Sequence, residues 1–333
     1  MKHPIFAVCV IALCAACGVA VADDYSTRPE VRAYINTMVM THNFDRDELN
    51  LLFKGVKQQT SALKAMDRQA EAKPWYEYRK LFVNDSRVEK GVAFWKKHAQ
   101  LLRRVEREYL VPASVVLAIA GVETYYGGNL GRFPVFDALV TLGFDYPRRA
   151  TFFRKELTEM LLLGREEGFD FEELRGSFSG AVGVSQFMPS SYRYYAVDFD
   201  DDGKRDLWHT PDALGSIANY LARHGWKHDG AVADRVSLKG DTDRLPLNKD
   251  IKPWLSQADA GNYGIERIDG VADNEPLFSI FAFELKDGVY EHWATYHNFY
   301  VISRYNHSRR YAMAVYQLGE ILKQRYLSEQ KDG

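Results

Sequence analysis

The stretch AIAGVETYYGG, residues 118–128, places one acid, Glu123, in an otherwise apolar segment that stops at two glycines. From Pro112 to Tyr126 the pattern predicts a central, buried helix of about 15 residues and roughly 22 Å. Removing a carboxylate from water costs more than nearby packing returns. Glu123 therefore either points into solvent from the last turn or is held in a cleft for a chemical purpose.

Two effects would keep the carboxyl of Glu123 protonated near neutral pH. The C-terminal end of a helix is negative, and burial beside Ile119, Ala120 and Val122 disfavours an anion. A protonated carboxyl is the state required of a general acid that protonates a glycosidic oxygen. Most glutamates near helix ends are nevertheless solvated, so this stretch by itself leaves both interpretations open.

The composition indicates a folded chain. It has 333 residues, of which 46% are hydrophobic and 26% charged, with a formal net charge of −2. These values are typical of two or three domains and do not suggest disorder. The near-neutral charge and the lack of a lysine or arginine block argue against a nucleic-acid partner.

The first 22 residues predict a secretory signal, with one lysine, a run of apolar and small residues, and Ala-Val-Ala before Asp23. We therefore expect export to the periplasm. The cysteines Cys9, Cys14 and Cys17 all lie in this segment, so the mature chain would contain no thiol. The alternative is an outer-membrane lipoprotein, lipidated at Cys17 and in peripheral membrane contact, but Cys14 stands where a large aliphatic residue is expected.

The remaining pattern predicts an α+β chain that is mainly α. Helices are expected from Pro29 onward and across 88–109, 147–167, 211–224 and 308–326. Residues 277–285 and 289–296 alternate around Lys286-Asp287-Gly288, as in an antiparallel hairpin. The expected domains are a helical domain completed by the C-terminal helix, a core, a small β domain and a final helical segment, at 24–107, 108–228, 229–302 and 303–333.

A second polar segment, GSFSGAVGVSQFMPSSY, covers residues 176–192. Its small residues between Ser179 and Gly183 let the backbone approach other backbone or a ligand closely. Gln186 offers a donor and an acceptor together, which suits hydroxyl or acetamido groups. Taken alone, the segment is equally consistent with a tight turn between packed helices.

DFDDDGKRDLWH, residues 198–209, matches the opening of an EF-hand loop. Asp198, Asp200 and Asp202 take its first three ligand positions, Lys204 would offer its carbonyl, and Asp206 takes the ninth position. His209 stands where a bidentate glutamate is usual, which should weaken affinity and make sodium an alternative to calcium. We expect a structural metal here and no cofactor for the chemistry.

Four successive motifs resemble those of the family B lytic murein transglycosylases. They are GVETYYGG, GSFSGAVGVSQFMPSSYRYYAVDFD, SIANYL and VISRYNHSRRYAMAVYQL, and the resemblance extends from KPWYEYR at 73–79 to the last helix. It implies a lysozyme-like core at 108–228 with an EF-hand-like site, one catalytic glutamate, and peptidoglycan glycan strands as substrate. Peptidoglycan synthases are a further partner to consider.

The resemblance also assigns roles to individual residues. The catalytic role falls on Glu123, with Ser177 beside it, and Ser179 replaces the more usual alanine or glycine, for which we expect only a local change. The implied substrate-binding residues are Gln186, Met188, Tyr220, Tyr305, Asn306 and Tyr311. To the sugar groove we add the tyrosines Tyr78, Tyr125 and Tyr126. Arg148 and Arg149 could meet stem-peptide carboxylates, although arginines in such a pair are more often surface charges.

A muramidase that uses water needs two carboxylates around the scissile bond. No cleft-lining motif offers a second acid, because the nearest, Asp137 and Asp145, are expected in loop-like surroundings. The family's chemistry needs only one acid and closes a 1,6-anhydro ring on muramic acid, with the substrate's acetamido group taking part. The alternatives are a hydrolytic muramidase and a non-catalytic envelope protein that binds glycan or calcium.

Overall fold

The computed structural model describes residues 24–67, 73–239, 245–267 and 275–331. These residues fall into two compact units, which divide between Lys57 and Gln58. The boundary lies inside the segment 24–107 that was expected to be one helical domain. The signal segment 1–22 and Cys17 lie outside the described residues, so export and lipidation stay predictions.

The first unit consists of short helices that pack on one another. They are the 3₁₀ turn η1 (Tyr25–Thr27), α1 (Pro29–His42) and α2 (Arg46–Lys54). Pro29 opens α1, where its missing N–H is not needed, and Asp45 caps α2 by accepting hydrogen bonds from the backbone of Asp47 and Glu48.

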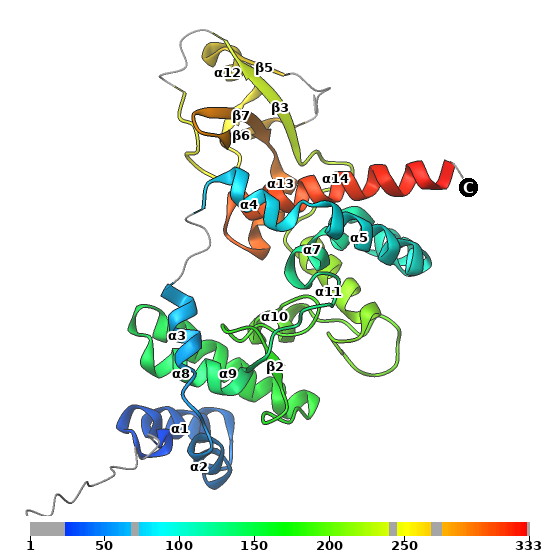
Figure 1. Ribbon diagram of the computed structural model, residues 1–333. Helices are drawn as coiled ribbons and strands as arrows, with labels where there is room; N and C mark the ends of the chain where they lie inside the picture. Colours follow the sequence, from blue (N-terminus) through cyan, green and yellow to red (C-terminus); the bar gives the residue numbers. More distant parts are fainter. Residues whose placement is uncertain (1–23, 68–72, 240–244, 268–274, 332–333) are drawn as a thin grey trace, which may run out of the picture. The chain divides into compact units, whose positions relative to one another are not determined.

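The centre of the second unit is α7 (Ala113–Thr124), the apolar helix that carries Glu123 (Figure 1). It has 12 residues, fewer than predicted, because the backbone turns left-handed at Tyr125 and Tyr126, with φ of 55° and 57°. Every residue of α7 except Glu123 is buried. Around it pack α5 (Asp85–Lys97), α6 (Ala99–Tyr109), α11 (Thr210–Arg223) and α14 (Arg309–Lys331).

The prediction of one helix over 88–109 is wrong. The helix breaks at His98, whose φ of −112° lies outside the helical range, and α5 and α6 follow one another on either side of it. The final helix, α14, runs beside α4 (Trp75–Phe82), α5 and α13 (His297–Tyr305) (Figure 1). The C-terminal helix therefore joins the helices at 75–97.

A second group of helices lies between α7 and α11 in sequence. It comprises α8 (Val135–Asp145), the turn η3 (Pro147–Arg149), α9 (Ala150–Glu167) and α10 (Pro189–Tyr195), with α3 (Thr60–Asp67) packed on α8. Two short strands, β1 (Phe133–Pro134) and β2 (Arg175–Gly176), pair antiparallel. This pairing brings the residues after α7 next to the segment that begins at Ser177.

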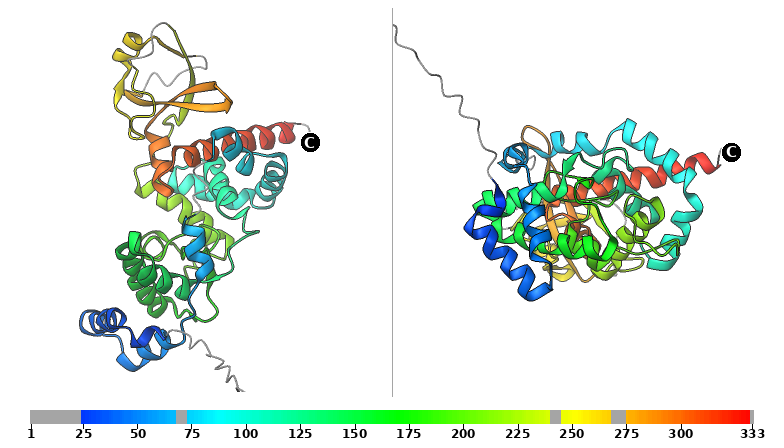
Figure 2. Two further views of the ribbon diagram at one scale, coloured as in Figure 1. Left: turned by 60° about the vertical axis from the view of Figure 1, so that its left-hand side comes forward. Right: turned by 90° about the horizontal axis from the view of Figure 1, so that it is seen from below.

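The predicted hairpin is confirmed and belongs to a five-stranded antiparallel sheet (Figure 2). The strands follow the order β4-β6-β7-β3-β5. β6 (Leu277–Lys286) and β7 (Val289–Thr295) turn at Gly288, whose φ of 72° suits glycine. β3 (Ala233–Leu238), β4 (Leu255–Ser256) and β5 (Ile265–Arg267) complete it, with α12 (Gln257–Ala260) and η4 (Gly261–Tyr263) between β4 and β5. The described residues are thus mainly helical with a small antiparallel sheet, as predicted.

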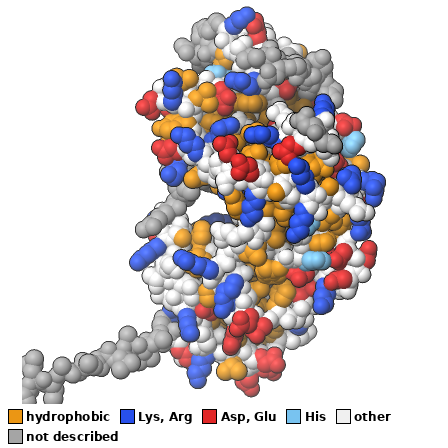
Figure 3. Space-filling view, turned by 45° about the vertical axis from the view of Figure 1, so that its right-hand side comes forward, with side chains coloured by type: hydrophobic (Ala, Val, Ile, Leu, Met, Phe, Trp, Pro, Cys, Tyr) orange, Lys and Arg blue, Asp and Glu red, His pale blue; other side chains and the backbone are white. Residues whose placement is uncertain are grey.

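The surface shows charges of both signs. On the face in Figure 3, lysine and arginine side chains are interspersed with acidic ones rather than gathered in one stripe. Among the described residues no helix combines the length and the apolar character needed to cross a membrane.

Candidate active site

Glu123 opens into a pocket of about 480 Å³. Three segments form its walls: the end of α7, the loop before β1, and the turn that follows β2. Gly131 is essential to this closure, because a Cβ there would lie 2.1 Å from the carbonyl oxygen of Gly176. The lining residues are Glu123, Asn129, Gly131, Arg132, Phe133, Ser177, Phe178 and Gln186.

The carboxyl of Glu123 has one hydrogen-bond partner in the described part of the chain. The hydroxyl of Tyr311, on α14, donates to Glu123 Oε1 at 2.7 Å. Burial raises the pKa of Glu123 to about 7, and the Tyr311 hydrogen bond acts in the opposite direction by favouring the anion. Close to neutral pH the carboxyl can therefore both give and take a proton.

The YN motif reaches the acid through its tyrosines. Tyr305 and Tyr311 stack with ring centroids 6.4 Å apart, and the Tyr305 hydroxyl donates to the Ser185 carbonyl at 2.6 Å. Burial first, and the nearby Glu123 second, raise the pKa of both tyrosines well above its ordinary value. Both hydroxyls therefore stay protonated and act as donors. Asn306 follows α13, is exposed, and does not line the pocket.

Ser177 and Gln186 belong to the turn after β2. The Ser177 hydroxyl accepts a hydrogen bond from the Ala181 N–H at 2.9 Å. Gln186 has a left-handed backbone, with φ of 49°, and its side-chain amide donates to the carbonyls of Gly183 and Leu130 at 2.9 and 3.3 Å. Its N–H groups thus tie two pocket walls together, and its side-chain oxygen is the atom left for a ligand.

Three further predicted residues do not line the pocket. Tyr78 is buried on α4 against Trp75 and is close enough to Tyr311 to raise the pKa of Tyr311. Tyr220 is buried on α11 and donates to the Arg304 carbonyl at 2.5 Å, in a ring cluster with Tyr305. Met188 is half-buried at the start of α10.

The groove assignment of Tyr126 is wrong. Its side chain is 5% exposed, its ring faces Gly121 and Gly91 so closely that neither could carry a Cβ, and its hydroxyl donates to the Arg87 carbonyl. The small residues on α5 and α7 make room for this ring, so Tyr126 joins two helices. Tyr125 lies under the Lys90 ammonium, 4.2 Å from the ring centroid, and does not line the pocket.

The remaining charged candidates lie outside the pocket. Arg148 is 80% exposed, with its guanidinium 3.7 Å from Asp67, and Arg149 covers the ring of Phe152. Asp137 and Asp145 are on α8 rather than in loops, which corrects that expectation. Neither acid lines the pocket, so neither is a second carboxyl beside Glu123.

Sequence reasoning missed one pocket wall, namely Asn129, Arg132 and Phe133, together with Phe178. Arg132 is exposed and has no ion pair with any described residue. The only signal in the sequence was the place of the loop, which begins at Asn129 directly after the two glycines that follow α7. The loop lies outside the motifs that carry the family resemblance, which end at Gly128 and resume at Gly176.

The metal loop clusters its acids as predicted. One oxygen from each of Asp198, Asp200 and Asp202 lies within 4.8 Å of the others. Asp198 also accepts hydrogen bonds from the backbone of Asp202 and Gly203, and Gly203 has φ of 88°, which holds the turn. These are hard oxygen ligands of the kind that calcium prefers.

The end of the loop differs from the expected pattern. His209 Nδ1 lies 3.3 Å from Asp200 Oδ2, and Asp212, which the sequence prediction missed, shares a second cluster with both. Lys204 donates its N–H to Asp202, which leaves its carbonyl available to a metal, whereas Asp206 accepts from the Trp208 N–H. Asp212 is fully buried and accepts from the backbone of Phe199 and Asp206.

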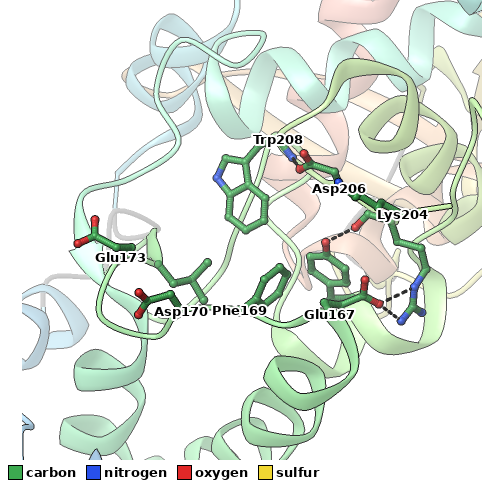
Figure 4. A pocket seen from close by; sticks show the side chains of 10 residues that line it. Glu167, Phe169, Asp170, Glu173, Lys204, Asp206 and Trp208 are labelled. Carbon is green, nitrogen blue, oxygen red and sulfur yellow. Dashed lines mark hydrogen bonds and ion pairs between the residues drawn. The ribbon is translucent and has the colours of Figure 1, made fainter. Parts of the chain in front are cut away.

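The loop connects to the acid site through backbone contacts. The Leu207 carbonyl accepts from Val184 N–H at 2.8 Å, and Thr124, next to Glu123, donates its hydroxyl to the Val184 carbonyl at 3.1 Å. On its other side the loop borders a hollow of about 360 Å³ that is lined by Phe169 and Trp208 (Figure 4). In this hollow the Glu167 carboxylate pairs with the Arg205 guanidinium.

A lone carboxyl with a pKa near neutral, at the end of a buried helix and facing a pocket, is the arrangement expected of a general acid. Residues 26–320 match the transglycosylase SLT domain family. The chain is 41% identical over 307 residues to the membrane-bound lytic murein transglycosylase B of Escherichia coli K12, covering 89% of this chain and 83% of that protein.

Two solved structures extend the comparison. The Escherichia coli lytic transglycosylase Slt35 in complex with calcium is 39% identical, with a TM-score of 0.84 over 91% of this chain and 96% of that one. Pseudomonas aeruginosa SltB3 in complex with NAG-NAM-pentapeptide is 30% identical, with a TM-score of 0.77 over 88% and 79%. The chain belongs to the transglycosylase SLT domain family. It is an enzyme of that family, and the resemblance seen in its motifs is confirmed.

Proposed function

We propose that the protein is a lytic transglycosylase that cleaves the MurNAc-β-1,4-GlcNAc bond of peptidoglycan without water and leaves 1,6-anhydro-MurNAc ends. The observation that carries this proposal is the state of Glu123: one carboxyl, with a pKa raised to about 7, alone among the titratable acids of its pocket. Such a group can donate a proton to a leaving oxygen and later accept one.

The proposed reaction uses Glu123 twice. It first protonates the glycosidic oxygen, and the bond from that oxygen to C1 of MurNAc breaks while the 2-acetamido oxygen of the same sugar bonds to C1. The ionised Glu123 then takes the proton from the C6 hydroxyl, whose oxygen bonds to C1 and displaces the acetamido oxygen. The proton returns to Glu123, no water is consumed, and the enzyme ends as it began.

The neighbouring donors fit this cycle. When Glu123 becomes an anion, the Tyr311 hydroxyl at 2.7 Å stabilises it, because a hydrogen bond to a charged group is stronger than one to a neutral group. Gln186 presents its side-chain oxygen to the pocket, where it can accept from a substrate N–H or O–H. We assign Ser177, Gln186, Met188, Tyr78, Tyr220 and Tyr305 to positioning the sugar chain.

Hydrolysis is the second candidate reaction, and the lining of the pocket argues against it. A hydrolytic muramidase holds two carboxyls roughly 5–10 Å apart around the bond. Of the pocket's described lining residues, Glu123 is the one acid. The substrate assignment is supported by the names of the relatives, one a murein transglycosylase and one bound to NAG-NAM-pentapeptide. Action on peptidoglycan fits the predicted export to the periplasm.

We also propose that the loop at 198–209 binds calcium and stabilises the fold. The clustered carboxylates of Asp198, Asp200 and Asp202 support this, as does the calcium complex of Slt35. Carboxylates this close repel one another, which destabilises the folded loop. A bound divalent ion removes this repulsion. The metal takes no part in the reaction. The carboxylates of Asp198, Asp200 and Asp202 would hold the metal in the loop, and none of these residues lines the pocket.

Product analysis tests the proposed reaction. Purified peptidoglycan is digested in H₂¹⁸O and the muropeptides are weighed by mass spectrometry. Non-hydrolytic cleavage predicts ends that are one water lighter than reducing ends and contain no ¹⁸O. Reducing ends that carry one ¹⁸O would show a hydrolase, and no cleavage at all would favour a binding protein.

A further inference from the structure

The turn after β2 holds two serine hydroxyls side by side. Ser177 Oγ and Ser179 Oγ are 3.1 Å apart, and either can be the donor. The turn is closed by Gly180, whose φ of 90° and tight fit against Leu139 leave no room for a side chain. It points Phe178 into the pocket beside Ser177, while Ser179 is half-buried and is not a lining residue.

The hydrogen-bond count at Ser177 decides what its hydroxyl can do. A hydroxyl has one hydrogen to give and two lone pairs to accept with. The Ala181 N–H occupies one lone pair of Ser177 Oγ, at 2.9 Å. If Ser179 donates to the second lone pair, both lone pairs of Ser177 Oγ are occupied. The Ser177 hydroxyl hydrogen then has no acceptor among the described residues, so its acceptor would be a ligand in the pocket.

Beside Ser177 the pocket needs a hydrogen-bond donor rather than an acceptor. The amide hydrogens of Gln186 are already given to Gly183 and Leu130. Once Glu123 has released its proton, the pocket contains a carboxylate together with the oxygens of the sugar. A Ser177 hydroxyl directed inward would meet this demand, and incoming hydrogen bonds strengthen an outgoing one.

We propose that Ser179 is a positioning residue: its hydroxyl donates to Ser177 and directs the Ser177 O–H into the pocket, toward an oxygen acceptor of the N-acetylated sugar. This inference rests on the proposed function and goes beyond it, because it assigns a role to a residue that does not face the substrate. Ser179 Oγ has no other partner in the described part of the chain, so its hydrogen is free for this bond.

A double-mutant cycle tests the inference. Wild type, Ser179→Ala, Ser177→Ala and the double variant are compared for kcat and KM on a defined oligosaccharide of alternating GlcNAc and MurNAc. Losing one neutral hydrogen bond predicts a kcat about 2- to 10-fold lower for Ser179→Ala. In the Ser177→Ala background the same change should have no effect, because the hydroxyl that it orients is gone.

Three controls keep the result interpretable. Ser179→Thr retains a hydroxyl and should recover most of the lost kcat. Ser237→Ala removes a half-buried serine hydroxyl on β3, far along the chain, and should leave kcat unchanged. Thermal melting of each variant shows whether the fold is intact.

The outcomes separate cleanly. A kcat of Ser179→Ala equal to wild type would overturn the inference, and so would a loss that is just as large when Ser177 is already alanine. The proposed function is judged separately, by whether wild type releases anhydro products. Hydrolytic products from an active wild type would overturn that function while the cycle still reported on Ser179.

Discussion

The acid pocket and the metal loop use the same chemical group in opposite ways. Glu123 is one carboxyl at the end of a buried helix, where partial removal from water raises its pKa to about 7. Asp198, Asp200 and Asp202 are carboxylates that the fold gathers within 4.8 Å at the surface. Desolvation favours the proton, whereas clustering in water favours a cation. The environment of a carboxyl, and not its identity, thus distinguishes the proposed proton-transfer group from the proposed metal ligands.

The largest expected effect comes from removing the proton of the acid site. Glu123→Gln keeps the shape of the side chain and its place in the pocket, but it cannot transfer a proton. We expect turnover to fall by about 10²–10⁴-fold with glycan binding retained. Initial rates and equilibrium binding, measured separately, check this.

Glu156→Gln is the matched control for that variant. Glu156 is also a buried glutamate with a raised pKa, but its carboxylate accepts hydrogen bonds from Ser190, at the start of α10. We expect it to lose stability and keep its turnover per folded molecule. Equal loss of turnover in the two variants would mean that burial alone, and not position, explains the effect of Glu123.

Tyr311→Phe should have the next largest effect. It removes the hydrogen bond that stabilises the Glu123 anion, so turnover should fall by about 10–10³-fold, the range for loss of one preorganised donor. The same loss removes the contribution that lowers the pKa of Glu123, so the alkaline fall in activity should move to higher pH. Unchanged turnover in Tyr311→Phe would remove Tyr311 from the proposed cycle.

The pH dependence of the wild type follows from the protonated acid. Because the first step needs the neutral carboxyl, kcat/KM should be level below pH 7 and fall about tenfold per pH unit above it. The free energy of unfolding should also depend on the ionisation of Glu123. In the unfolded chain Glu123 has its ordinary pKa of 4.5, whereas in the folded chain its pKa is about 7. The folded state therefore holds more protons between these values.

The sign of the stability effect follows from this difference. Stability due to Glu123 is fully present below pH 4.5 and declines as the pH rises toward 7. Urea unfolding across this range should show the decline in wild type and a flatter profile in Glu123→Gln. Parallel profiles for the two proteins would show that Glu123 is ionised in both states.

The metal loop should respond in stability and not in chemistry. Calcium at about 100 times its dissociation constant should stabilise wild type by about 2.7 kcal/mol, and a chelator should reverse this. Asp200→Asn removes a carboxylate that both acidic clusters share, so the calcium-dependent rise in melting temperature should shrink strongly while kcat at saturating substrate changes little. A melting temperature that ignores calcium and chelator alike would contradict the metal assignment.

The smallest effect tests the correction at Tyr126. Tyr126→Phe keeps the ring between Gly91 and Gly121 and loses only the hydrogen bond to the Arg87 carbonyl. We expect a loss of about 1 kcal/mol in the free energy of unfolding and no change in KM. A raised KM would return Tyr126 to the groove.

Residue patterns predicted the parts of this molecule that depend on local chemistry. The apolar run at 113–124, the hairpin at 277–295 and the acidic loop at 198–206 were all recognisable, because burial, alternation and ligand spacing leave direct traces in sequence. The resemblance then supplied what local chemistry could not. It assigned Glu123 and Tyr311, 188 positions apart, to one site, and the structure shows a hydrogen bond between the two that the sequence did not predict.

The errors arose where tertiary packing decides. The helix breaks at His98 without a glycine or proline to signal the break. Tyr125 and Tyr126 both have a left-handed backbone, and they differ in the direction in which the turn after α7 points each ring. The pocket wall at 129–133 depends on the approach of Gly131 to Gly176, a contact between distant segments. Such contacts depend on three-dimensional neighbours that a single sequence does not reveal.

The most direct measurement is a titration of the Glu123 carboxyl itself. Infrared difference spectra between wild type and Glu123→Gln, recorded in the folded protein from pH 4 to 9, isolate the carbonyl band of the protonated group. The account predicts that this band persists through pH 6 and is lost with a midpoint near 7. A band lost with a midpoint near 4.5, the ordinary value for glutamate, would contradict it.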